Sequence, residues 1–177
     1  MSSSSLPLEI ERKYLIHHPD PAFLASQDGA YRIDIRQTYL TPDAAGNRRI
    51  RRWEDRGGVK FIITRKEKVT AVTRIERESE LTESAYLALL AEADPARETL
   101  VKTRWRLPYR GQELEIDLYP FWTKIAVLEV ELTCEEQPVL LPPWLDLIRE
   151  VTGEEAYSNA SLSKLLKDRA GIVPENL

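Results

Sequence analysis

Charged residues recur at every second position in several segments of this sequence, the spacing that places side chains on one face of a β-strand. Four acidic pairs and two basic pairs have it: Glu9 and Glu11, Glu78 and Glu80, Glu115 and Asp117, Glu129 and Glu131, Arg49 and Arg51, Lys102 and Arg104. Lys13 and Lys66 are single basic residues in similar segments. Apolar residues such as Ile10, Ile50 and Val130 lie between the charges. The pattern predicts strands with one charged face and one apolar face.

These residue types suit phosphate and metal chemistry. Arginine and lysine side chains that converge from several strands match the oxygens of a polyphosphate. Clustered carboxylates are the hard oxygen ligands that Mg²⁺ or Mn²⁺ prefers, and ligand type alone leaves Ca²⁺ open. Any single pair of charged residues could lie on the solvent-exposed outer face of a strand. The repetition favours a charged interior, which is costly unless the charges are paired or bound to ions. Cations and metal around a phosphoryl group are the usual arrangement for phosphoryl transfer.

No competing catalytic motif is present in the sequence. It lacks a Gly-rich phosphate loop of the Walker type, a Gly-x-Ser-x-Gly elbow and a His-rich metal motif. The two histidines, His17 and His18, stand beside Pro19 and are predicted to mark a solvated strand end.

Alternating patterns and turn residues predict eight strands. They span residues 8–16, 31–40, 48–55, 59–67, 73–81, 100–107, 112–119 and 125–133. Arg56-Gly57-Gly58 is a hairpin turn between the third and fourth strands.

Four helical segments are predicted between and after these strands. A short one lies within residues 17–30, and a second follows Thr82, a residue type favoured at helix N-caps. A third is expected to start at Pro142 and Pro143, with Trp144, Leu147, Ile148 and Val151 on one face. The last covers about Ala160 to Arg169.

Mostly sequential strands with hairpin-like turns favour an α+β fold: an eight-stranded antiparallel β-barrel with a charged interior, a tunnel, and helices packed outside. A barrel of eight strands has an interior that just holds one small ligand. The length of 177 residues suits a single domain over residues 1–177, and residues 1–6 are predicted to be disordered.

Composition narrows the class of protein. Hydrophobic residues make up 42% and charged residues 31%, and 29 acidic against 25 basic residues give a net charge of −4. This balance argues against nonspecific binding to nucleic acid or anionic membrane, although residues 48–68 are locally basic. The single cysteine, Cys134, excludes an intramolecular disulfide. With no signal peptide and no long apolar run, we expect a cytoplasmic protein without a membrane segment.

The charged segments resemble, in order, the motifs of the CYTH superfamily, the triphosphate tunnel metalloenzymes. Glu9-x-Glu11-x-Lys13 is similar to the N-terminal motif of that family. The further matches are Gln37-Thr38-Tyr39-Leu40, Arg49-Ile50-Arg51, Thr64-Arg65-Lys66, Glu78-Ser79-Glu80, Lys102-Thr103-Arg104, Glu115-Ile116-Asp117, Glu129-Val130-Glu131 and Tyr157-Ser158-Asn159. Ser158 departs from the pattern, because relatives often have lysine there. The run Arg48 to Arg52 leaves two strand registers open, and Ile50 on the apolar face favours Arg49 and Arg51 inside.

The resemblance implies a tunnel that binds a triphosphate and two divalent ions, Mg²⁺ or Mn²⁺. The phosphate-binding residues would be Lys13, Arg49, Arg51, Lys66, Lys102 and Arg104. The metal ligands would be Glu11, Glu80, Glu129 and Glu131, assisted by Glu78, Asp117 and Glu9. Residues close to the reaction would be Glu9, Glu11, Lys13 and Tyr39. One ion would bridge phosphate oxygens, and a second would activate the attacking water.

The function predicted first is metal-dependent hydrolysis of inorganic triphosphate to pyrophosphate and phosphate. Other chemistries on the same fold stay open: thiamine triphosphatase, nucleoside or RNA triphosphatase, and class IV adenylyl cyclase. Trp53, Tyr39 or Trp105 could stack on an organic ring. A module that binds polyphosphate without turnover is a further alternative, but it would be expected to lose metal carboxylates, and all the acidic pairs are intact. The oligomeric state cannot be read from the sequence.

Overall fold

The computed structural model describes residues 8–43, 46–68 and 73–168, and for residues 8–9, 66–68 and 73–76 it describes the backbone alone. The predicted disorder of residues 1–6 lies outside the described residues. The strands are β1 (Leu8–His17), β2 (Tyr31–Tyr39), β3 (Asn47–Asp55), β4 (Gly58–Lys68), β5 (Thr73–Leu81), β6 (Leu100–Tyr109), β7 (Gln112–Leu118), β8 (Ile125–Leu132) and β9 (Leu147–Glu150). The helices are α1 (Pro21–Ala25), α2 (Glu83–Leu89) and α3 (Asn159–Asp168), with single 3₁₀ turns at Leu90–Glu92 and Glu155–Tyr157.

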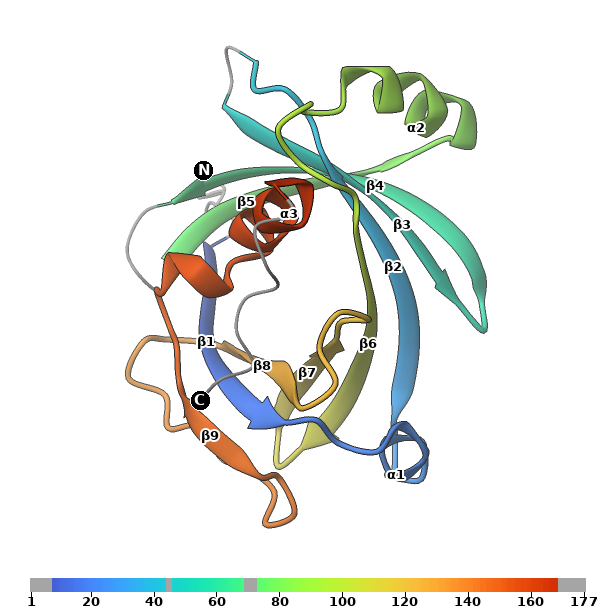
Figure 1. The fold of residues 1–177 in the computed structure, drawn as a ribbon. Coiled ribbons are helices and arrows are strands. Elements are labelled where there is room, and N and C mark those ends of the chain that lie inside the picture. Colours follow the sequence, from blue (N-terminus) through green and yellow to red (C-terminus); the bar gives the residue numbers. More distant parts are fainter. Residues whose placement is uncertain (1–7, 44–45, 69–72, 169–177) are drawn as a thin grey trace, which may run out of the picture.

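The strands form one antiparallel sheet in the order β5-β4-β3-β2-β6-β7-β8-β1-β9. The sheet curls strongly, and Figure 1 looks into the ring of strands. β1 also pairs with β5, the strand at the far end of the order, over Leu8–Ile10 and Thr73–Ile75. All eight predicted strands are therefore present, in the predicted antiparallel arrangement.

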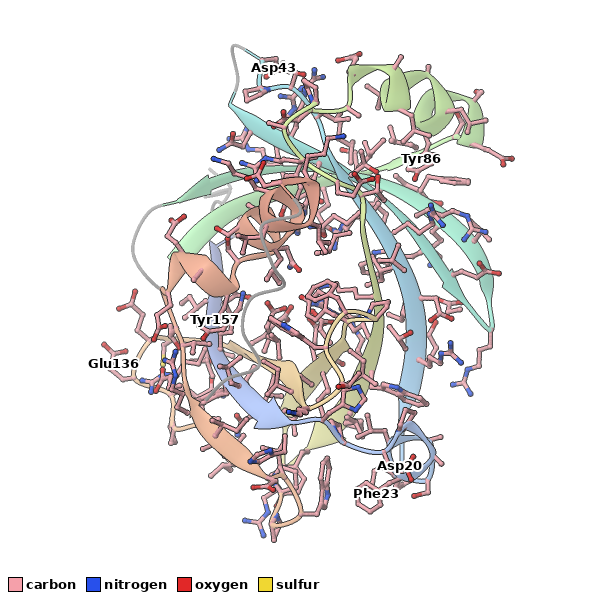
Figure 2. The ribbon with its side chains drawn as sticks, in the orientation of Figure 1. Asp20, Phe23, Asp43, Tyr86, Glu136 and Tyr157 are labelled. Atoms are coloured by element: carbon pink, nitrogen blue, oxygen red, sulfur yellow. The ribbon has the colours of Figure 1, made fainter. Side chains whose placement is uncertain are left out.

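Apolar side chains on the outer face of the sheet are covered by helices and loops. Under α2, Tyr86 packs with Ile50 and Leu40, and Figure 2 shows Tyr86 between the helix and the strands. Thr82 caps this helix as predicted, because its hydroxyl accepts a hydrogen bond from the Ala85 N–H at 3.2 Å. On the opposite side, Leu24 of α1 packs against the outer faces of β6, β7, β8 and β1.

A third apolar cluster lies on the inner face, at one end of the ring. Leu15, Val127 and Leu100 meet Leu162 of α3 there, and Tyr119 and Trp122 fill the space between. α3 thus packs across this end of the inner face, whereas α1 and α2 lie outside the sheet. The remainder of the inner face carries the charged residues described below.

The helix predicted from Pro142 and Pro143 is wrong. Residues 142–146 form a loop with a turn at Pro143 and Trp144, and Leu147–Glu150 is a strand, β9, that pairs antiparallel with β1. The reason is an open strand edge: β5 pairs with β1 only as far as Ile10, so Tyr14–Ile16 would expose unpaired backbone groups on that side. The apolar residues that were expected on one helix face do not form one buried surface. Leu147 is 43% exposed, whereas Trp144 packs on the outer core.

None of the helices in the described part of the chain has the length and apolarity needed to cross a membrane.

Candidate functional site: a charged cavity on the inner face

The inner face of the curled sheet surrounds a cavity of about 590 Å³. Basic side chains reach it from β1, β3 and β6, and carboxylates from β1, β5, β7 and β8. The basic residues on these strands are Lys13, Arg48, Arg49, Arg51, Lys102, Arg104 and Arg106, with Arg97 from the segment before β6, and the acidic ones on these strands are Glu11, Glu78, Glu115, Glu129 and Glu131. Most of the charges recognised by their spacing therefore line one space, as an inside-out barrel requires.

The structure decides the register of β3. Ile50 is completely buried in the outer cluster under α2. Arg51 lies opposite Gln37 of β2, and Arg49 lies opposite Tyr39, all on the inner face. The register that places Arg49 and Arg51 inside is thus the one adopted, while Arg52 pairs with Glu54 outside.

Arg104 is the centre of a buried ion-pair network on β6, β7 and β8. Its guanidinium donates two hydrogen bonds of 2.7 Å to Asp117 and one of 2.7 Å to Glu129, and it also contacts Glu115. Lys102 Nζ lies 2.5 Å from Asp117, and Lys13 Nζ lies 2.8 Å from Glu129. Buried charges of this kind are tolerated because each has a partner with good geometry.

The network sets the protonation of its carboxylates. Burial alone would raise the pKa of Glu129, but the charges of Lys13 and Arg104 hold that pKa well below its usual range. Burial likewise opposes the ionisation of Asp117, and Arg104 and Lys102 overcome it and lower the pKa. Both groups are therefore carboxylates at neutral pH.

A second group of contacts joins β3, β4 and β5. The Arg51 guanidinium donates to the Thr64 hydroxyl at 3.0 Å and to the carboxylate of Glu78. Thr64 in turn donates to Glu78 at 2.9 Å. Arg51 is only 6% exposed, so its charge is held in place on the wall opposite β7 and β8.

Four carboxylates face one another across three neighbouring strands. Glu11 of β1 lies directly opposite Glu131 of β8, and Glu115 of β7 lies directly opposite Glu129. Burial and the charge of Glu115 raise the pKa of Glu131. Directly opposed like charges are destabilising, and a cation between them would relieve the repulsion. Within residues 8–43, 46–68 and 73–168, no group of three or more His, Cys, Asp or Glu side chains is clustered closely enough to hold a metal as it stands.

The other predicted site residues have different environments. Tyr39 lines the cavity and accepts a hydrogen bond of 3.0 Å from Gln37. Asp117 is fully buried behind Lys102 and Arg104 and does not line the cavity. Glu80 is exposed on β5 and also lies off the cavity lining. The side chains of Glu9 and Lys66 lie outside the described residues.

Several lining residues were not identified from the sequence. Arg106 continues the alternation of Lys102 and Arg104, so the spacing could have indicated it. Thr152 could not be found, because its segment was expected to be helical. Its hydroxyl accepts a hydrogen bond of 3.0 Å from the Lys13 N–H and so ties the segment after β9 to the cavity wall. Trp53 lines the cavity, whereas Trp105 packs in the outer core and cannot stack on a ligand there.

No family profile matches the sequence, and no curated protein matches it significantly. Solved structures do match. Two structures of the protein NE1496, one of them described as an inorganic triphosphatase, are 25% and 24% identical, each with a TM-score of 0.53 over 88% of this chain and 97% and 94% of theirs. A conserved hypothetical protein from Pyrococcus furiosus is 16% identical, with a TM-score of 0.52 over 72% of this chain and 80% of its own. These likenesses concern the fold.

Proposed function

Because this chain has the triphosphate tunnel fold, also called the CYTH fold, we propose that it is a metal-dependent triphosphatase that hydrolyses inorganic triphosphate to pyrophosphate and phosphate. One observation carries the proposal. Seven basic side chains from three strands line a single cavity whose other walls carry carboxylates. The volume of about 590 Å³ is in the range of small-ligand sites, roughly 300–1,000 Å³.

The carboxylates of the cavity are of the type that a divalent cation takes as ligands, and a bound ion would draw them closer together than they stand among the described residues. Glu11 and Glu131 are opposed across strands and repel one another, whereas Glu115 and Glu129, also opposed, share contacts with Arg104. Carboxylate oxygens are the ligands that Mg²⁺ and Mn²⁺ prefer. Glu11, Glu129 and Glu131 would hold the ion, with Glu115 beside them. A bound ion would supply charge neutralisation at phosphoryl oxygens and an acidified water.

The basic residues would bind and orient the triphosphate. Arg51 and Arg104 carry planar guanidinium groups that can hold two phosphate oxygens at once, and Lys13 and Lys102 act as point charges. Their placement on three strands, β1, β3 and β6, would hold the phosphate chain at several points in the cavity. The buried positions of these cations exclude water around the phosphates, which strengthens each electrostatic contact.

The aromatic residues of the cavity favour an inorganic substrate over an organic one. Tyr39 has the guanidinium of Arg97 5.1 Å from its ring centre, and Trp53 has that of Arg51 at 4.9 Å. Both rings are thus engaged by cations of the protein. The similar protein NE1496 is described as an inorganic triphosphatase, which supports the same choice.

The test is phosphate release from inorganic triphosphate, ATP, thiamine triphosphate and pyrophosphate, each with Mg²⁺, Mn²⁺ or a chelator. Turnover of inorganic triphosphate that the chelator abolishes, with the other compounds much slower, is the expected result. Faster phosphate release from an organic triphosphate would show that this compound, and not inorganic triphosphate, is the substrate. Cyclic AMP formed from ATP would identify a cyclase. Tight triphosphate binding by calorimetry without any release would identify a binding module instead.

A further inference from the structure

We propose that Trp53 is a positioning residue that holds two arginines, Arg51 and Arg106, in the orientation in which they bind phosphate. The inference rests on the proposed function, since it assigns the guanidinium groups of both arginines to a triphosphate. Trp53 and Arg106 lie outside the motifs that the sequence analysis assigned to phosphate or metal. Arg106 becomes, by the same inference, a further phosphate-binding residue.

The need for such a residue comes from a gap in the charged wall. β2 lies between β3 and β6, and its inner-face residues next to Lys102 and Arg104 are Ile35 and Ile33. Both isoleucines are 1% exposed and offer no polar atom to a neighbouring guanidinium. The arginines of β3 and of β6 therefore stand on either side of an apolar strip. Trp53 lies directly opposite Ile35 in the register of β2 and β3, beside this strip.

Guanidinium groups from two strands, β3 and β6, lie over the indole of Trp53. The guanidinium carbon of Arg51 lies 4.9 Å from the centre of the ring, and that of Arg106 lies 5.7 Å from it. Both distances are within the range of about 6 Å in which a cation is attracted to an aromatic face. An arginine of β3 and an arginine of β6 are thus joined through one side chain across β2.

Ion pairs hold nitrogen atoms of each guanidinium, and the indole ring lies close to its central carbon. Arg51 donates through Nη2 to Thr64 and Glu78. Arg106 donates through Nε to Glu115 at 2.8 Å, and its Nη2 forms an ion pair with the same carboxylate at 2.7 Å. An edge contact alone leaves the plane free to tilt. Contact with the indole restricts this tilt, which pre-organises the donors that remain for phosphate oxygens.

The indole N–H is consistent with this role. Nε1 of Trp53 is buried and finds no hydrogen-bond partner among the described residues. A buried unsatisfied donor is unfavourable. The ring is therefore placed by contacts of its faces and not by a hydrogen bond of its edge.

The experiment compares Trp53→Leu, Trp53→Phe and the wild type for affinity and turnover of inorganic triphosphate. Trp53→Leu removes the aromatic face, and we expect affinity in chelator, measured by calorimetry, to weaken roughly tenfold through two lost cation–π contacts. KM should rise by a similar factor while kcat stays within about twofold, because binding and not chemistry is affected. Trp53→Phe keeps an aromatic face and should restore most of the affinity.

Arg106→Lys supplies an independent check, since lysine keeps the charge but loses the planar group. In the double variant with Trp53→Leu its effect should be much smaller than in the wild type, because the contact between the two residues is already gone. Trp144→Leu, at a tryptophan that packs outside the sheet against Phe23, is the control and should leave triphosphate affinity unchanged.

Three outcomes overturn the inference: wild-type affinity in Trp53→Leu, equal losses in Trp53→Leu and Trp53→Phe, or additive effects of the Trp53 and Arg106 changes. If Trp53→Leu does not fold, Trp53→Met, which also lacks an aromatic face, takes its place in the single and double variants, and the same three outcomes reject the inference. A wild-type protein that neither binds nor hydrolyses inorganic triphosphate would instead reject the proposed function.

Discussion

Lys102 is the most buried of the basic residues described around the cavity, at 3% exposed. Burial and the charge of Arg104 lower its pKa to about 8, although Asp117 and Glu129 act in the opposite direction. A lysine in an unfolded chain titrates near ~10.4. Between about pH 8 and about pH 10 the folded chain therefore binds fewer protons than the unfolded chain, and the contribution of Lys102 to stability rises with pH.

We predict that the stability of the wild type relative to Lys102→Met increases across this range. Methionine has a similar length and no charge, and Asp117 keeps its bonds to Arg104 in the variant. Urea unfolding of both proteins at about pH 7 and about pH 9.5 measures the difference. Below about pH 8 the Lys102 ammonium is charged in the folded and in the unfolded chain, so the full cost of burying this charge reduces the free energy of unfolding there. An identical difference at the two pH values would mean that the pKa of Lys102 is not lowered.

Helix α3 places its N-terminus at the cavity. Ser158, the residue before the helix, accepts a hydrogen bond of 3.1 Å from the Ser161 N–H, as an N-cap does. Ser158, Asn159 and Ala160 all line the cavity. Leu162 anchors the same helix in the apolar cluster at this end of the inner face. Ser158, the residue at which this sequence departs from the motif it resembles, thus has a structural role as a helix cap.

Two variants separate this role from phosphate binding. Ser158→Ala should lower the free energy of unfolding by about 1 kcal/mol, the usual cost of a lost N-cap, and leave triphosphate affinity near that of the wild type. Ser158→Lys should lose the same stability but bind triphosphate more tightly, because an ammonium group is brought to the cavity. Urea unfolding and calorimetry with inorganic triphosphate measure the two effects. Equal affinities of the alanine and lysine variants would show that this position does not reach the phosphates.

β9 is the element that links the outer edge of the sheet to the site. It pairs with β1, and the chain after it continues the contact, since the Val151 N–H donates to the Lys13 carbonyl at 2.8 Å. With the bond from the Lys13 N–H to Thr152, both backbone groups of Lys13 are held. A residue expected to bind phosphate is therefore fixed by a segment more than 130 positions away.

The elements that could be predicted from the sequence are the strands in which charged and apolar residues alternate. The eight strands follow from period-two patterns, and the inner positions of Arg49 and Arg51 follow from Ile50 between them. β9 could not be predicted, because it pairs with backbone groups of β1 that β5 leaves unpaired, and that edge exists only in the assembled sheet. The environment of Asp117 was also beyond the sequence. Its spacing places it on the inner face, but only the structure shows Lys102 and Arg104 covering it.

The charges around Glu129 and Arg104 are paired with one another before any ligand binds. Glu129 is bonded to Lys13 and Arg104, and Arg104 also contacts Asp117 and Glu115. A triphosphate that takes Lys13 and Arg104 would leave Glu129 without its partners, which is costly in a buried site. A divalent ion at Glu129 would leave the two cations facing each other. Each ligand therefore removes the cost that the other creates, so their binding should be positively coupled.

We predict that Mg²⁺ and a non-hydrolysable imido analogue of triphosphate together raise the melting temperature by more than the sum of their separate effects. In Glu129→Gln the amide is uncharged and does not require a cationic partner, so the analogue alone should stabilise this variant more than it does the wild type.

The Glu129→Gln variant should also hydrolyse triphosphate more slowly. Its turnover with Mg²⁺ should fall by roughly two orders of magnitude or more, the loss typical of a removed catalytic electrostatic group. Glu136→Gln, at an exposed residue on the outside of the molecule (Figure 2), is the matched control. Simple additivity of the two shifts in the wild type would contradict the coupling, because it would mean that the ion pairs around Glu129 survive when phosphate binds.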